Sequence, residues 1–347
     1  MKRIFAMLLG LCMIVAIVAC DTNKAPVEKD YKLGMGVVVS MDSSKTGNAQ
    51  VDATVATVVT DADGKIVACR IDVAQNKMNV TDGAVDTAAT FKTKMELGDA
   101  YGMAPVKIDN DGNGVTKEWY EQAKAFEAYV VGKTVAEVEA IKTQEVNNHL
   151  IAVDQALLDA GCSMQITDFI AAVVKACKDD QGMSFKTASE FTLGVAATTT
   201  AADSTAATAE ANGTVKMYTD FAATVVVDGK IVAALNDAIQ PNITVNAAGE
   251  IVEKSFKATK RELKGDYGMA PVKIDNDKNG ITKEWFEQSA EFSKFVVGKT
   301  AAEVSALKTQ EAGGHQIAVD QALLDAGCSI QITAIKAVVA KAVTNAR

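Results

Sequence analysis

Several residue types and patterns are scarce in this chain of 347 residues. It has only four prolines and two histidines, and none of its six cysteines form a Cys-x-x-Cys pair. The low proline content excludes long polyproline linkers, and the cysteine spacing argues against zinc and iron–sulfur sites. No arrangement of His, Cys and Asp has the spacing of a hydrolase, and the net charge of −9 argues against nucleic acid as a partner.

The most extended apolar run lies at the N-terminus. A basic start at Met1 precedes the apolar segment 4–18, which is shorter than the roughly 20 residues of a membrane-spanning helix. A small residue and Cys20 follow, in the order typical of a bacterial lipoprotein signal peptide. We expect a signal peptide at 1–20 whose lipobox ends at the lipidated Cys20, a tether at 21–30, and an extracytoplasmic, lipid-anchored protein. An ordinary signal peptide with an incidental cysteine is the alternative.

The rest of the chain is organised by a long internal repeat. The stretch YGMAPVKIDND at Tyr101 returns at Tyr267, an offset of 166 residues. A period of this length indicates a duplicated domain and not a solenoid. We therefore expect one domain at 31–180 and a second at 187–347. The Ala/Thr/Ser-rich stretch 196–209 is interpreted mostly as a surface loop within the second domain.

Each repeat begins with strand patterns and ends with helix patterns. In the first repeat, β-branched residues at 51–60 and an extended pattern at 66–73 flank an Asp-Gly turn. An amphipathic stripe predicts a helix at 117–131, Thr134 opens a capping box, and a last helix is expected at 167–178. Strands followed by helices favour an α+β fold, here two tandem homologous domains, each an antiparallel sheet with C-terminal helices.

The sequence Ala-Gly-Cys-Ser occurs shortly before the last helix of both repeats. It places Ser163 and Ser329 close to a helix start, where exposed N–H groups favour an anion. Gly161 and Gly327 allow a sharp turn and leave room for a bulky group. A phosphate is one candidate ligand for such a segment, and a plain turn before a helix is the alternative.

Longer stretches carry a family resemblance. The segments VDATVATVVTDADGKIV, DAYGM, KEWYEQ and GKTVAEV resemble the flavin-bearing lipoproteins of Gram-positive extracellular electron transfer, the PplA type, with tandem FMN-binding domains. The resemblance covers nearly the whole mature chain. In proteins of that kind, a separate flavin transferase attaches FMN through its phosphate to a Ser or Thr. The wider FMN-binding family marks this position with Ser/Thr-Gly-Ala-Ser/Thr.

The resemblance implies a cofactor site in each repeat. The glycine and the final hydroxyl of the family motif are present, whereas its leading hydroxyl and its alanine are replaced. Ser163 and Ser329 are the implied attachment points, and Thr167 and Thr333 are the fallback hydroxyls. The motif residues expected at the two cofactor sites are Gly161, Cys162, Ser163, Gly327, Cys328 and Ser329.

Aromatic, thioether and imidazole groups are candidates for contact with the flavin. A flat ring can pack on tyrosine and methionine side chains, and a histidine can donate a hydrogen bond. Trp119 and Trp285 are further candidates, although they are as readily explained as core residues, and the histidines as loop residues. The predicted flavin contacts are Tyr101, Gly102, Met103, His149, Tyr267, Gly268, Met269 and His315.

Acidic loops between these segments resemble the start of an EF-hand. Oxygen ligands at loop positions 1, 3 and 5 followed by glycine suit Ca²⁺, but position 12 is Tyr120 or Phe286 where a glutamate is needed. An Asx turn before the helix is the alternative. The candidate calcium ligands are Asp109, Asp111, Asn113, Asp275, Asp277 and Asn279.

The resemblance, together with the lipobox, implies a redox carrier and not an enzyme in its own right. Two covalently bound FMN groups would pass electrons from a membrane dehydrogenase or the quinone pool to an external acceptor. The expected partners are the flavin transferase, the electron donor, and the membrane through the lipid anchor. The alternative is a lipid-anchored surface binding module whose loops are stabilised by calcium.

Overall fold

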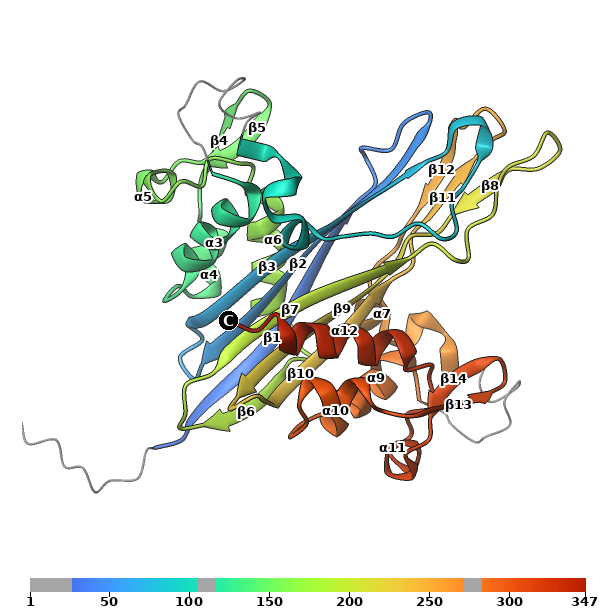
Figure 1. The fold of residues 1–347 in the computed structure, drawn as a ribbon. Coiled ribbons are helices and arrows are strands. Elements are labelled where there is room, and N and C mark those ends of the chain that lie inside the picture. Colours follow the sequence, from blue (N-terminus) through green and yellow to red (C-terminus); the bar gives the residue numbers. More distant parts are fainter. Residues whose placement is uncertain (1–26, 105–116, 271–282) are drawn as a thin grey trace, which may run out of the picture.

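The fold is described from a computed structural model, which defines residues 27–104, 117–270 and 283–347 (Figure 1). The predicted signal peptide, Cys20 and most of the expected tether lie outside the described residues. The two acidic loops also lie outside them, so the six candidate calcium ligands remain predictions.

The first repeat contains long strands followed by short helices. Its strands are β1 (Lys29–Ser40), β2 (Asn48–Asp61), β3 (Ile66–Asn79), β4 (Thr143–Val146), β5 (His149–Ala152) and the connecting strand β6 (Met183–Thr187). Its helices are α1 (Lys94–Leu97), α3 (Trp119–Val130), α4 (Val135–Glu139), α5 (Gln155–Asp159) and α6 (Thr167–Cys177), with 3₁₀ turns η1 (Thr81–Gly83) and η2 (Gly98–Tyr101).

The second repeat follows the same order with an additional small sheet. Its strands are β7 (Thr192–Thr200), β8 (Gly213–Val215), β9 (Tyr218–Val227), β10 (Lys230–Ile239), β11 (Asn242–Val245), β12 (Ile251–Ser255), β13 (Thr309–Ala312) and β14 (His315–Ala318). Its helices are α7 (Lys260–Leu263), α9 (Trp285–Phe295), α10 (Ala301–Ser305), α11 (Gln321–Asp325) and α12 (Thr333–Thr344), with the 3₁₀ turn η3 (Lys264–Tyr267).

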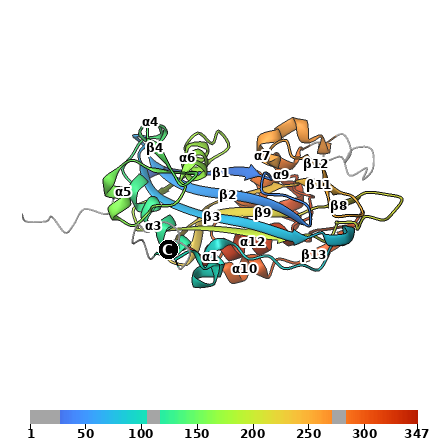
Figure 2. The same cartoon turned by 90° about the horizontal axis from the view of Figure 1, so that it is seen from above.

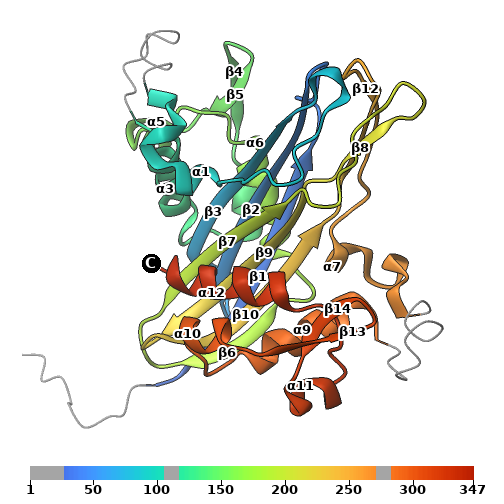
Figure 3. The same cartoon turned by 45° about the vertical axis from the view of Figure 1, so that its right-hand side comes forward.

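All described strand pairs are antiparallel, and the predicted α+β class is confirmed. The two main sheets have the strand orders β3-β2-β1-β6 and β10-β9-β7. A third sheet, β12-β11-β8, lies near the ends of β2 and β3 (Figure 3). The turn of Gly47 donates there to the carbonyl of Gly249 at 2.9 Å, so the extension of the second repeat is tied to the first.

The two main sheets face each other across one apolar interior. This interior includes Leu33 and Phe185 from the first sheet and Phe221 and Ile239 from the second half. Two further cores lie between each sheet and its own helices, so that α6 and α12 lie on opposite sides of the strands (Figure 2). The repeats are therefore joined by a shared core as well as by the short connection after α6.

The expectation of a surface loop at 196–209 is wrong for its first part. Strand β7 continues to Thr200, and Ala196 and Ala197 are buried. The small residues serve close packing: a Cβ on Gly194 would lie 1.9 Å from the carbonyl oxygen of Ala342 in α12. Strand β7 is therefore rich in small residues, as loops often are, because helix α12 packs closely against it.

The predicted capping signals form as expected. The Thr134 side chain accepts from the backbone N–H of Glu137, and the glutamate carboxylate accepts from the N–H of Thr134. The same box forms at Thr300 in the second repeat. The helix expected at 117–131 begins at Trp119, because Glu118 forms its own capping box.

Candidate functional site

Each repeat contains a pocket on the helix side of its sheet, beside the segment around α1 or α7. The pocket in the first repeat has a volume of about 430 Å³, and its counterpart in the second repeat has about 350 Å³. Both volumes are within the range of small-molecule sites. The lining residues that correspond in the two repeats include Tyr101 and Tyr267, Met103 and Met269, Trp119 and Trp285, His149 and His315, and Gln165 and Gln331.

The aromatic walls of the two pockets carry a lysine that the sequence patterns do not single out. Lys94 Nζ lies 4.8 Å from the ring centre of Tyr101 and 5.4 Å from that of Trp119. Lys260 lies in the same way over the aromatic rings of the second pocket, at 5.0 and 5.2 Å. These distances permit cation–π attraction, which holds the ammonium group against the ring faces.

The two tryptophans have both of the positions considered from the sequence, in the core and at a pocket. Trp119 and Trp285 are only 2% and 4% exposed, so they are core residues, yet both line the pockets. His149 and His315 begin the second strands of the hairpins β4–β5 and β13–β14. Their side chains are exposed and contribute to the pocket walls.

Ser163 and Ser329 lie beside the pockets and do not line them. Both side chains are buried, with 5% and 2% exposure. The following residues, Met164 and Ile330, line the two pockets. The predicted attachment points are thus one residue away from the pocket walls, on a segment that is packed inside the protein.

A buried glutamine connects each serine segment to its pocket. The Gln122 side chain accepts from the backbone N–H of Ser163 at 3.0 Å and of Met164 at 3.1 Å. Its amide nitrogen donates to the carbonyl of Lys117 and lies 3.5 Å from the sulfur of Met103, a pocket residue. The serine segment and the pocket therefore share one fixed side chain.

The second repeat forms the same connection. Gln288 accepts from the N–H of Ser329 at 2.8 Å, donates to the carbonyl of Lys283, and lies 3.8 Å from the sulfur of Met269. Neither glutamine is predicted from the sequence. The signal is present, because both occupy the same position of the repeated Lys-Glu-Trp segment at the 166-residue offset.

The glycines of the serine segments are covered by a lysine. Gly161 and Gly327 have φ of +88° and +89°, which side chains rarely adopt. A Cβ on Gly161 would lie 2.8 Å from Lys117 Nζ, and this ammonium group donates to the carbonyl of Ala160 at 2.7 Å. The Lys117 ammonium group therefore contacts the segment that carries Ser163, and Lys283 makes the same contact in the second repeat.

The remaining residues predicted for the cofactor sites lie in the cores or at the ends of turns. Cys162 and Cys328 are fully buried in the helix-side cores and are not among the residues that line either pocket. Burial raises the pKa of Cys328 to about 12, which keeps its thiol protonated. Gly102 and Gly268 end the short turns η2 and η3 with φ of +72° and +73°.

The two pockets differ in the placement of their carboxylates. Asp168 lines the first pocket, and burial followed by the neighbouring Asp52 raises its pKa. Asp220 lines the second pocket, where burial raises its pKa to about 6 against the opposing effect of Lys260. The sites therefore share a tyrosine and a tryptophan but present different charge patterns to a ligand.

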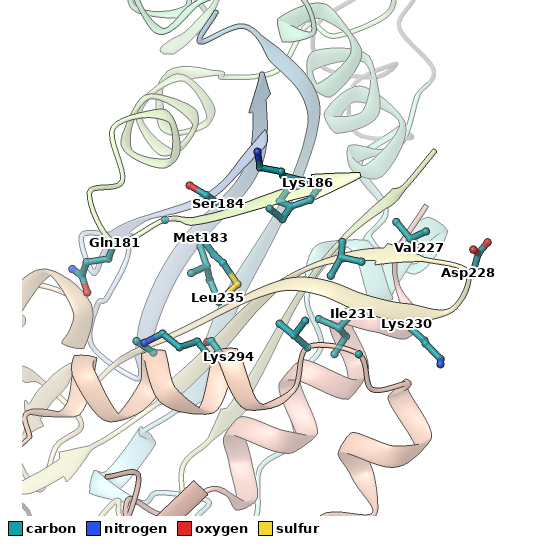
Figure 4. Close-up of a pocket in the computed structure, with 17 residues that line it drawn as sticks. Gln181, Met183, Ser184, Lys186, Val227, Asp228, Lys230, Ile231, Leu235 and Lys294 are labelled. Atoms are coloured by element: carbon teal, nitrogen blue, oxygen red, sulfur yellow. The ribbon is translucent and has the colours of Figure 1, made fainter. Parts of the chain in front are cut away.

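A larger cavity lies away from these pockets. It has a volume of about 1090 Å³ and lies between β6, β10 and α9, with Met183, Ile231 and Leu235 among its lining residues (Figure 4). Three lysines and one aspartate also line it: Lys186, Lys230, Lys294 and Asp228. None of the predicted site residues contributes to it.

Two further properties concern the described ranges alone. Within them, no group of three or more His, Cys, Asp or Glu side chains has the arrangement needed to hold a metal ion. No helix among residues 27–104, 117–270 and 283–347 is long and apolar enough to cross a membrane.

Comparison with known proteins connects part of the chain with a redox protein. A stretch of 133 residues is 33% identical to the chlorophenol reductase of Desulfitobacterium hafniense. The match covers 33% of this chain and 38% of that protein, so the chain spans well under half of its relative's length. No family model matches the chain, and no solved structure matches it.

Proposed function

We propose that the protein is a membrane-anchored, extracytoplasmic electron carrier with FMN linked through its phosphate to Ser163 and Ser329. The observation that carries this proposal is the duplicated pocket beside the duplicated serine segment, with one buried glutamine contacting both. A distant reductase relative supports a redox role for the chain. The carrier would take electrons from a membrane dehydrogenase or the quinone pool and pass them to external acceptors.

The residues at each site fit the two chemically different parts of FMN. Trp119, Tyr101 and Met103 offer flat or polarisable surfaces to an aromatic ring. Lys117 lies against the serine segment, where a phosphate would gain from a nearby cation. When bound, FMN supplies the transfer of one or two electrons, while the protein positions the group and sets its electrostatic surroundings.

Attachment to a buried serine requires access. Ser163 and Ser329 are almost fully covered in the folded chain. We therefore propose that the transferase acts before the serine segment packs against Gln122 or Gln288, or on an opened form of it. In this proposal the protein does not catalyse its own modification and is not an enzyme.

Intact-mass spectrometry of the full chain, co-expressed with a flavin transferase, tests the proposal. The wild type is expected to carry the added mass of two FMN groups, each less one water. Ser163→Ala and Ser329→Ala should each carry one, and the double variant none. Ser184→Ala, which alters an exposed serine of β6, serves as the control and should retain both.

Two outcomes would redirect or overturn the proposal. Retention of both added masses in Ser163→Ala would move the first attachment point, and a shift of the modified peptide to Thr167 would identify the new one. Wild-type protein that is colourless and unmodified after production with an active transferase would exclude covalent FMN from both repeats.

A further inference from the structure

Two ion pairs cross between the repeats in a reciprocal manner. Lys341 on α12 of the second repeat contacts Glu96 on α1 of the first, with 2.7 Å between Nζ and Oε1. Lys175 on α6 of the first repeat contacts Glu262 on α7 of the second, also at 2.7 Å. Both lysines and both glutamates are related by the 166-residue offset, so the same contact is made twice in opposite directions.

The glutamates belong to the short helices that place the pocket lysines. Glu96 forms a capping box with Thr93, which fixes the first turn of α1. Lys94 lies in this turn, and its ammonium group lies over the aromatic wall of the first pocket. Lys341 therefore contacts the segment that positions Lys94 in the other repeat.

The electrostatic effect of this contact is visible in the glutamate. Burial alone would raise the pKa of Glu96, but hydrogen bonds from Lys341 and Thr93 outweigh burial and lower the pKa. Lys341 also donates to the carbonyl of Ala197 in β7 at 2.7 Å. Its ammonium group is thus fixed on the sheet of its own repeat while it binds the other.

We infer that Lys341 and Lys175 are positioning residues through which each repeat holds part of the other repeat's pocket. The inference deepens the proposed function, because the identity of the pocket ligand, FMN, is taken from that proposal. The mechanical link concerns only α1 and α7 and is independent of the ligand. A consequence is that each pocket, although lined by its own repeat, depends on the other repeat for the position of its lysine.

The two directions of the link differ in strength. Within its own repeat, α1 is also held by Asp72, whose carboxylate accepts from the N–H of Met95 at 3.1 Å. Helix α7 has the equivalent bond to Asp237, and the first repeat holds it through a second contact as well, the buried ion pair of Arg261 with Asp179 at 3.0 Å. Loss of Lys175 alone should therefore affect α7 less than loss of Lys341 affects α1, because the Arg261–Asp179 pair remains.

Hydrogen exchange of the full-length protein tests this inference without a ligand. Lys341→Gln should increase exchange at the amides of Glu96 and Leu97 by about 1.5- to 5-fold, the range that corresponds to a partly exposed ion pair. The matched control is Lys336→Gln on the same helix, because Lys336 donates to the carbonyl of Leu307 within its own repeat. The control should leave α1 unchanged.

The equivalent substitution in the first repeat tests the opposite direction of the link. Lys175→Gln should increase exchange in α7 by a smaller factor, and Lys178→Gln should not, because Lys178 pairs with Glu139 in its own repeat. Unchanged exchange in α1 with Lys341→Gln, or an equal increase with Lys336→Gln, would overturn the inference.

A loaded protein separates this inference from the proposed function. In a Ser329→Ala background, flavin would be confined to the first repeat, and Lys341→Gln should change its fluorescence while Lys336→Gln should not. If the protein carries no flavin after production with an active transferase but Lys341→Gln still alters exchange in α1, the proposed function is refuted and the link stands. Bound flavin with unaltered exchange and fluorescence would refute the link.

Discussion

Replacing Gln122 by methionine should destabilise the protein strongly although the side chain keeps nearly the same size. Gln122 is fully buried and accepts from the backbone N–H groups of Ser163 and Met164. A buried donor that loses its acceptor costs about 1–3 kcal/mol, so two such donors give about 2–6 kcal/mol. We expect the free energy of unfolding of Gln122→Met to fall by an amount within this range.

Urea unfolding of the full chain, followed by circular dichroism, measures this effect. Gln165→Met is the control, because Gln165 is exposed and lies two residues after Ser163. The control should change the free energy of unfolding by less than about 0.5 kcal/mol, as is usual for surface positions. Gln288→Met should cost less than Gln122→Met, because Gln288 accepts from one backbone N–H in place of two, and its other donor, the Ser329 hydroxyl at 3.5 Å, is free to rotate. A loss below about 1 kcal/mol for Gln122→Met would refute the reasoning.

Three further substitutions test the buried parts of the fold. Burial raises the pKa of Asp72 to about 6, so the folded chain binds a proton more readily than the unfolded chain, and stability falls as the pH rises from about 4 to about 7. In urea unfolding, the free energy of unfolding of Asp72→Asn should fall by about 3 kcal/mol less than that of the wild type over this pH range. The same pH dependence in both proteins would contradict this expectation. Gly161→Ala should destabilise more than Gly102→Ala in thermal unfolding, because both have positive φ but only Gly161 has the Lys117 side chain against it. Gly34→Ala should lower stability by about 1–3 kcal/mol, since its Cβ would meet the backbone of α6 at 2.0 Å, and an unchanged melting temperature would contradict this packing.

Local signals in the sequence predict much of the helical part and one hairpin in each main sheet. The Asp-Gly turns at 63–64 and 228–229 separate β2 from β3 and β9 from β10, and the capping box at Thr134 opens α4. These features depend on residues close together in the chain. Strands β1 and β7 are not predicted, because their glycines and alanines weaken the alternating pattern and are explained only by the helices packed on them.

The site is predicted in part for a similar reason. The repeat offset selects Tyr101, Met103 and His149, which the structure brings together in one pocket. Gln122 and Lys94 are missed because their roles arise from contacts with segments distant in the sequence. Whether the serines carry a cofactor stays a prediction.

The apolar interior between the two main sheets has a practical consequence for dissecting the protein. A fragment ending after α6 would expose the inner face of its sheet, including Leu33 and Val55, to water. Such a surface favours aggregation during expression. One site is therefore better silenced by a point substitution in the intact chain than by truncation.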